Sequence, residues 1–146
     1  MKRGAPRRSA GATAGYSGKP LVEKLGIKPG HLVLIRNAPR GYGITLGRLP
    51  PGAFRYASGK GPFDVIQVFV SAESDLRAAI RALRPVMKRD GMLWVSWPKK
   101  SSGRKTDVDE NDVRHAGLAL DLVDVKICAV DEVWSGLKFV IPLALR

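Results

Sequence analysis

Aromatic and charged residues gather in three short segments of this sequence, at residues 37–43, 97–103 and 131–136. Cations beside aromatic rings suit a ligand that carries both phosphate and a base or sugar, because the rings can stack while the cations bind phosphate. We predict a ligand-binding rim made of Tyr42, Trp97, Lys99, Lys100, Asp131, Glu132 and Trp134.

A purely structural interpretation of the same residues stays open. Lys99 and Lys100 can pair with Asp131 and Glu132, and each such exposed pair contributes at most about 1 kcal/mol. The tryptophans can then pack as lids over the core.

The other reactive side chains predict neither a catalytic group nor a metal site. His31 begins an apolar run and His115 lies in a polar helical segment, so no ligand spacing connects them. Cys128 is the single cysteine of the chain and lies in an apolar run, which is typical of a small core residue.

Apolar runs and helical spacing indicate the elements that must position the rim. Strands are predicted at residues 32–35, 54–57, 65–70, 92–97, 125–130 and 137–143. Helices are predicted at residues 20–25, at 71–87 with Ser71 as cap, and from 106 onward with a capping box of Thr106 and Asp109. This order predicts an α/β fold with a mostly parallel sheet that ends in an antiparallel strand pair.

Charge separates the first residues from the rest of the chain. The sequence has 25 Lys and Arg against 13 Asp and Glu, a formal net charge of +12, which favours anionic partners. Residues 1–15 are basic and lack an apolar period, so they are predicted to be a flexible tail before a single α/β domain at residues 16–146. With no membrane-spanning run and no signal-peptide core, the chain is expected to be cytoplasmic and not to bind membranes.

Short motifs in chain order resemble class I methyltransferases. They are LGIKPG at residues 25–30, FDVI at 63–66, LRP at 83–85 with DGML at 90–93, and the closing strand pair around residues 135–136. The resemblance implies a reduced Rossmann-like sheet. Residues 15–139 also resemble a family of small bacterial proteins of unknown function, through WPKKSSG at 97–103 and VDEVWSGL at 130–137. That second resemblance implies no particular activity.

The methyltransferase resemblance also implies a cofactor loop, and this sequence departs from its pattern. In such enzymes an acid at the end of the first strand and glycines in the next turn hold S-adenosylmethionine. Ile35 stands at the acidic position, while Asn37 and Pro39 replace two glycines; Gly41 and Gly43 remain. Residues 54–60 contain no carboxylate for the ribose. We therefore expect no cofactor.

The main functional hypothesis is a non-catalytic or cofactor-altered Rossmann-like module, not an enzyme, that binds an anionic ligand or a protein partner. One alternative is an S-adenosylmethionine-dependent methyltransferase with an aberrant cofactor loop. Another is a nucleic-acid-associated protein that uses its basic tail.

Deleting residues 1–15 tests the tail. The thermal unfolding midpoint should stay nearly unchanged, because the segment has no core-facing pattern. Affinity for nucleic acid should fall, and its salt dependence should weaken by about 0.9 in slope for each duplex phosphate that the tail neutralises. Binding titrations at several salt concentrations measure this effect. Equal binding by the full and the shortened chain would contradict a role for the tail.

Overall fold

A computed structural model describes residues 18–146 of the chain. The tail predicted at residues 1–15 lies outside this range. The elements, in chain order, are α1 (Leu21–Lys24), β1 (Leu32–Arg36), α2 (Tyr42–Leu46), β2 (Phe54–Tyr56), β3 (Phe63–Phe69), α3 (Glu73–Leu83), η1 (Arg84–Val86), β4 (Met87–Pro98), η2 (Lys100–Ser102), α4 (Glu110–Ala119), β5 (Val123–Ala129), β6 (Trp134–Val140) and η3 (Leu143–Leu145).

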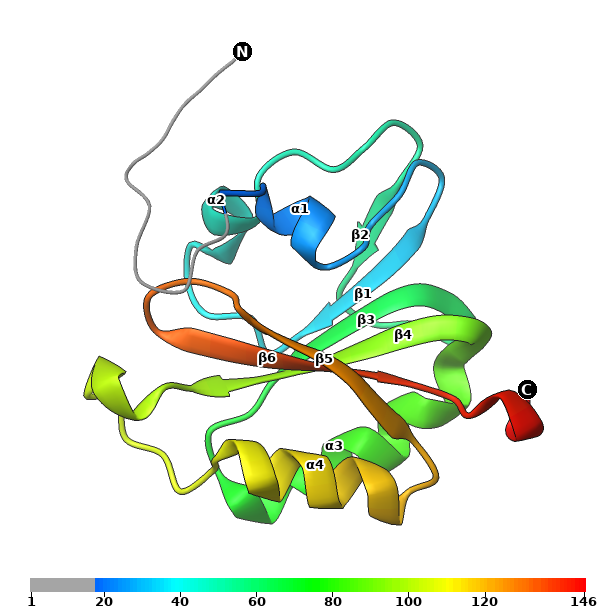
Figure 1. Ribbon diagram of the computed structural model, residues 1–146. Coiled ribbons are helices and arrows are strands. Elements are labelled where there is room, and N and C mark those ends of the chain that lie inside the picture. The colour runs from blue at the N-terminus through cyan, green and yellow to red at the C-terminus, as the bar shows by residue number, and fades with distance from the viewer. Residues whose placement is uncertain (1–17) are drawn as a thin grey trace.

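The strands form one sheet in the order β2-β1-β3-β4-β6-β5 (Figure 1). β2, β1, β3 and β4 run parallel to one another, whereas β6 is antiparallel to both β4 and β5. The predicted fold class, a reduced Rossmann-like sheet with an antiparallel end, is therefore confirmed. The parallel strands β1, β3 and β4 all end at the same edge of the sheet, called the carboxyl edge below.

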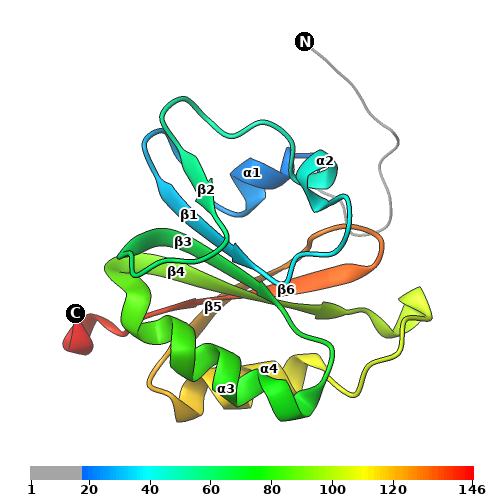
Figure 2. The ribbon, with the colours of Figure 1, turned by 180° about the vertical axis from the view of Figure 1, so that it is seen from behind.

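Helices cover the two faces of the sheet separately (Figures 1 and 2). α3 and α4 lie together on one face, and α1 and α2 lie on the other. α3 buries Leu76, Ile80 and Leu83, whose spacing places them on one side of the helix. β3 and β4 lie between the two helical layers, and this explains why their apolar runs do not alternate with polar residues.

The predicted helix over residues 71–87 is too long at both ends. The observed helix, α3, begins at Glu73, after Ala72. The carboxylate of Asp107, and not Ser71, accepts the hydrogen bond of the Glu73 amide, at 2.7 Å. It ends at Leu83, since Pro85 has no N–H to donate. From Met87 the chain instead pairs with β3, so β4 begins before the turn expected at residues 90–91.

The predicted capping box of α4 is displaced by three residues. Asp109 and Asp112 exchange the two capping hydrogen bonds, at 2.9 and 3.0 Å. Thr106 instead donates its hydroxyl to the carbonyl of Ser71, at 2.7 Å. This bond joins the segment before α3 to the segment before α4.

Within residues 18–146, no helix is long and apolar enough to cross a bilayer.

Substitution of Gly117 tests how closely α4 packs on the sheet. A Cβ atom at this position would overlap the ring of Phe139, which is buried in β6. We expect Gly117→Ala to lower the free energy of unfolding by about 1–3 kcal/mol, the usual cost of overpacking a core. Chemical denaturation measures this loss. Asn111→Ala, at an exposed position of the same helix, should change it by less than about 0.5 kcal/mol; equal effects would contradict the packing.

Candidate functional site

Four segments meet at or next to the carboxyl edge of the sheet. They are the turn between β1 and α2, the start of α3, the loop around η2 that follows β4, and the tip of the β5–β6 hairpin (Figures 1 and 2). Ligands of open α/β sheets bind at such an edge, because loops of variable sequence are held there by rigid strands. The carboxyl edge is therefore the candidate site.

A chain of buried hydrogen bonds fixes the turn between β1 and α2 to the sheet. The Tyr42 hydroxyl donates to Oε1 of Gln67 at 2.6 Å, and Nε2 of Gln67 donates to Oγ of Ser96 at 3.1 Å. All three residues are buried, and Gln67 is only 1% exposed. Each polar group would be costly to bury without its partner, so the chain positions α2 above β3 and β4.

Burial also sets the protonation state of Tyr42. It raises the pKa of the hydroxyl above the ordinary value of 10.0, while the neighbouring Asp131 adds to the increase and the bond to Gln67 opposes it. The Tyr42 hydroxyl, which is protonated at neutral pH in any tyrosine, therefore keeps its proton at more alkaline pH as well and remains a hydrogen-bond donor there.

An aromatic row lies beside this chain, and we define it as Tyr42, Phe69 and Trp134. The ring centroids of Tyr42 and Phe69 are 4.8 Å apart, and those of Phe69 and Trp134 are 4.9 Å apart, both in edge-to-face contact. An arginine lies over each end: the Cζ atom of Arg55 is 5.9 Å from the Tyr42 centroid, and that of Arg104 is 5.1 Å from the Trp134 centroid.

The structure brings only some of the predicted rim residues together. Tyr42 and Trp134 belong to the core between the sheet and α1 and α2, whereas Trp97 packs into the core beneath α3 and α4. Trp134 is 4% exposed, and Trp97 and Tyr42 are buried as well. These rings cannot offer their faces to a ligand in this conformation. Whether any rim residue contacts a ligand stays a prediction.

The charged rim residues form no ion pairs with one another in the described part of the chain. The ion pairs of residues 18–146 join Lys88 to Asp64, and Arg114 to Glu110 and Asp124. Lys99, Lys100 and Glu132 take part in none of these. Oδ1 of Asp131 accepts the amides of Val133 and Trp134, both at 2.8 Å, and so holds the hairpin tip.

The turn at residues 37–43 is open on its outer side. Asn37 and Gly41 have positive φ angles of 60° and 80°. A Cβ atom at Gly41 would meet no heavy atom within 4 Å, and one at Gly43 would meet only a guanidinium nitrogen of Arg55, at 3.6 Å. The space in front of this turn can therefore admit a ligand close to the backbone.

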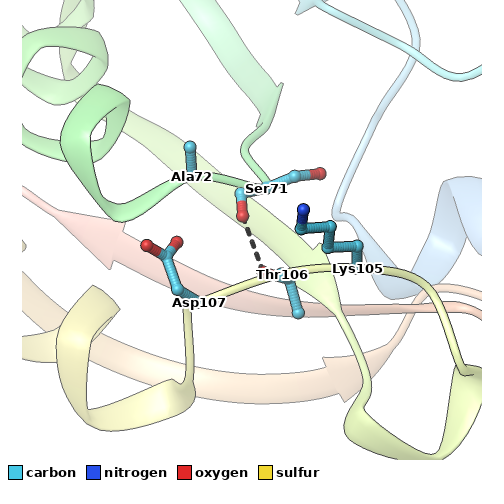
Figure 3. A pocket seen from close by; sticks show the side chains of 5 residues that line it. All are labelled: Ser71, Ala72, Lys105, Thr106 and Asp107. Atoms are coloured by element: carbon cyan, nitrogen blue, oxygen red, sulfur yellow. Dashed lines mark hydrogen bonds between the residues drawn. The ribbon is translucent and has the colours of Figure 1, made fainter.

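A pocket of about 370 Å³ lies where the chain leads into α3 and α4. It is lined by Ser71, Ala72, Lys105, Thr106 and Asp107, as Figure 3 shows. The hydrogen bond from Thr106 to Ser71 joins its two walls. Sequence reasoning missed this pocket because Ser71 and Thr106 were interpreted as helix caps. Their position directly after a strand and a basic loop was the available signal.

Comparison with known proteins places this fold among methyltransferases. No family model and no curated protein matches the chain. Magnesium protoporphyrin IX methyltransferase from Synechocystis PCC 6803, with bound S-adenosylhomocysteine, is 15% identical with a TM-score of 0.56, covering 84% of this chain and 78% of its own. An S-adenosylmethionine-dependent methyltransferase from Aquifex aeolicus is 13% identical with a TM-score of 0.56, covering 84% and 88%.

A third similar structure carries both a cofactor product and a substrate. It is the 1,6-didemethyltoxoflavin-N1-methyltransferase of Burkholderia thailandensis with bound 1,6-didemethyltoxoflavin and S-adenosylhomocysteine, which is 15% identical with a TM-score of 0.54 and covers 82% of this chain and 73% of its own. At such low identity these likenesses establish the fold. This protein therefore shares a Rossmann-like fold with these methyltransferases.

These comparisons correct the main functional hypothesis. The residue pattern favoured a non-catalytic binding module, not an enzyme, with no cofactor. The similar structures are methyltransferases, and two of those described contain the demethylated cofactor. The hypothesis gave too much weight to Ile35, Asn37 and Pro39, although the groups that a loop offers to a ligand depend on its backbone shape as well as on residue type.

Removing the Tyr42 hydroxyl tests the buried hydrogen-bond chain. Tyr42→Phe should lower the free energy of unfolding by about 1–3 kcal/mol, because Oε1 of Gln67 loses its donor in the core. In the background of Gln67→Leu the same change should cost at least about 0.5 kcal/mol less, since the two groups interact directly. Denaturant unfolding of both single variants and the double variant measures the coupling. Additive effects would contradict it.

Proposed function

We propose that this protein is an S-adenosylmethionine-dependent methyltransferase. The observation that carries the proposal is the open turn between β1 and α2 at the carboxyl edge of a methyltransferase-like sheet. The pocket at the start of α3 and α4 lies at the end of the neighbouring strands, where an acceptor molecule would meet the cofactor.

The residues around the turn fit this cofactor with an altered set of donors and acceptors. Gly41 leaves space for close approach, and the exposed Asn37 offers a side-chain amide that can replace the backbone donor absent at Pro39. A carboxylate is available from the hairpin: Oδ1 of Asp131 is used within the protein, and Oδ2 accepts no hydrogen bond from residues 18–146, so it can accept one from a ligand hydroxyl. Asp131 lies near enough to Tyr42 to affect its pKa.

The bound cofactor would supply an electrophilic methyl group. The part of this chain is to place an acceptor atom in line with that group and to exclude water. Gln67 and Ser96 hold Tyr42, and Tyr42 in turn holds the turn in place. Lys105 and Asp107 at the pocket supply charges that can orient the acceptor.

Family, cellular location, domain organisation and partners are proposed as well. We propose that the chain belongs to the small bacterial family that residues 15–139 resemble, and that it acts in the cytoplasm. We also propose that residues 1–15 form a basic tail on a single domain at residues 16–146, and that its partners are anionic. The charge of +12 supports an anionic partner.

Calorimetric titration with S-adenosylhomocysteine tests the cofactor. We expect a dissociation constant tighter than about 100 μM, near −5.5 kcal/mol. Gly43→Leu should weaken binding at least about tenfold, a loss of about 1.4 kcal/mol, because the new side chain enters the space in front of the turn. Its Cβ atom makes only ordinary contact with Arg55, so the fold should be kept.

Ala78→Leu is the matched control for this substitution. Ala78 is exposed on α3, on the opposite face of the sheet, so its replacement should leave the affinity within about twofold. If the unchanged protein shows no heat of binding up to millimolar cofactor, the proposal fails.

A further inference from the structure

Six basic side chains lie on segments at or beside the candidate site, and we call this set the basic rim. It comprises Arg40 on the β1–α2 turn, Arg55 on β2, and Lys99, Lys100, Arg104 and Lys105 on the loop around η2. None of them takes part in the ion pairs found within residues 18–146. Of the acids nearby, Asp107 accepts the Glu73 amide through Oδ1, and Asp131 accepts amides of its own hairpin through Oδ1.

The aromatic row has one arginine of the basic rim at each end. Arg55 lies over the ring of Tyr42 and Arg104 over that of Trp134, and the middle member of the row is Phe69. The three rings are buried and cannot shift independently. The two guanidinium groups are exposed, and the cation–π contact of each with a buried ring favours a position at its own end of the row.

Two cations at opposite ends of a row suit a ligand with repeated negative charges. A small anion can contact only one end of the row, whereas successive phosphates of one strand can contact both ends. Guanidinium groups can bind two phosphate oxygens at once, so these arginines suit the phosphodiester groups of a nucleic acid. Lys105, on the same loop as Arg104, lines the pocket and adds a positive charge there.

We propose that the methyl acceptor of this protein is a nucleic acid, whose phosphates are bound by Arg55 and Arg104 of the basic rim. This proposal rests on the proposed methyltransferase function, because it names the substrate class of the same site. The buried aromatic row thereby acts as the support of the phosphate-binding arginines. The strand would run along the carboxyl edge, from the β1–α2 turn to the loop around η2.

Fluorescence polarisation with the full chain tests this proposal. The probes are a single-stranded RNA of about 20 nucleotides, longer than one typical single-strand site, and a DNA duplex of similar length. Arg55→Gln/Arg104→Gln should weaken binding of the preferred probe about tenfold or more. For single strands the slope of log affinity against log salt should fall by about 1.4, since each phosphate that is no longer neutralised removes about 0.7.

A variant with the same loss of charge elsewhere is the control. Arg77→Gln/Arg81→Gln lies on exposed positions of α3, beneath the other face of the sheet, and should change affinity less than about twofold. Each single variant, Arg55→Gln or Arg104→Gln, should show about half of the slope change of the double variant. Thermal unfolding of all variants checks that the fold is kept.

The outcomes separate this proposal from competing ones. Equal weakening by the rim and α3 variants would mean that net charge alone attracts the probe, and would overturn the assignment of Arg55 and Arg104. Polyglutamate that competes as well as RNA at equal charge would indicate an acidic protein partner and overturn the proposal. Absence of binding to both nucleic acid probes would overturn it too.

The cofactor titration shows whether the nucleic acid proposal alone is wrong or the methyltransferase proposal as well. Binding of S-adenosylhomocysteine without binding of nucleic acid rejects the acceptor proposed here and keeps the methyltransferase function. Binding of nucleic acid without any cofactor rejects the methyltransferase function, and with it the role of nucleic acid as an acceptor.

Discussion

The hydrogen bonds that link Tyr42, Gln67 and Ser96 are the interaction on which the site depends. They link polar side chains of β3 and β4 in a core that is otherwise apolar, and each of the three residues has a hydrogen-bond partner within this network. A buried network of this kind permits one arrangement of its members, because any shift leaves a donor or an acceptor unsatisfied. The first residue of α2 is therefore tied to the middle of the sheet, and the turn before it takes a single shape.

That tie also determines what the aromatic residues do. Tyr42 is held by its hydroxyl, so its ring has a fixed position against Phe69, and Phe69 fixes Trp134 in turn. The rings of Tyr42 and Trp134 are buried in this conformation, and the exposed guanidinium groups of Arg55 and Arg104 lie over them. Charge at the carboxyl edge is thus positioned by the core and not by ion pairs on the surface, which would neutralise it.

The turn between β1 and α2 shows how the surroundings of a proposed cofactor site can differ from what residue types alone indicate. Pro39 removes one backbone donor, and no acid follows β1 or β2 at the positions that the methyltransferase resemblance implies. Yet the turn is open at Gly41, and a carboxylate comes from the hairpin residue Asp131, about ninety residues later in the chain. Ligand affinity depends on the groups around the ligand and not on which strand carries them. A carboxylate that is missing at one position in the sequence can therefore be replaced by one from another segment.

Much of the fold could be predicted from the sequence, because it depends on local patterns. The apolar stretches within β1, β3 and β4 and the spacing of Leu76, Ile80 and Leu83 on α3 indicate burial, and both patterns can be read within one segment. The ends of α3, the burial of Trp97 and Trp134 on opposite faces, and the pocket beside Ser71 depend on partners that are distant in sequence. The sequence by itself determined most of the strands and helices. Only the tertiary structure decided that Trp97 and Trp134 are core and that the arginines of the basic rim face solvent, since burial and pairing at the carboxyl edge arise from contacts between separate segments.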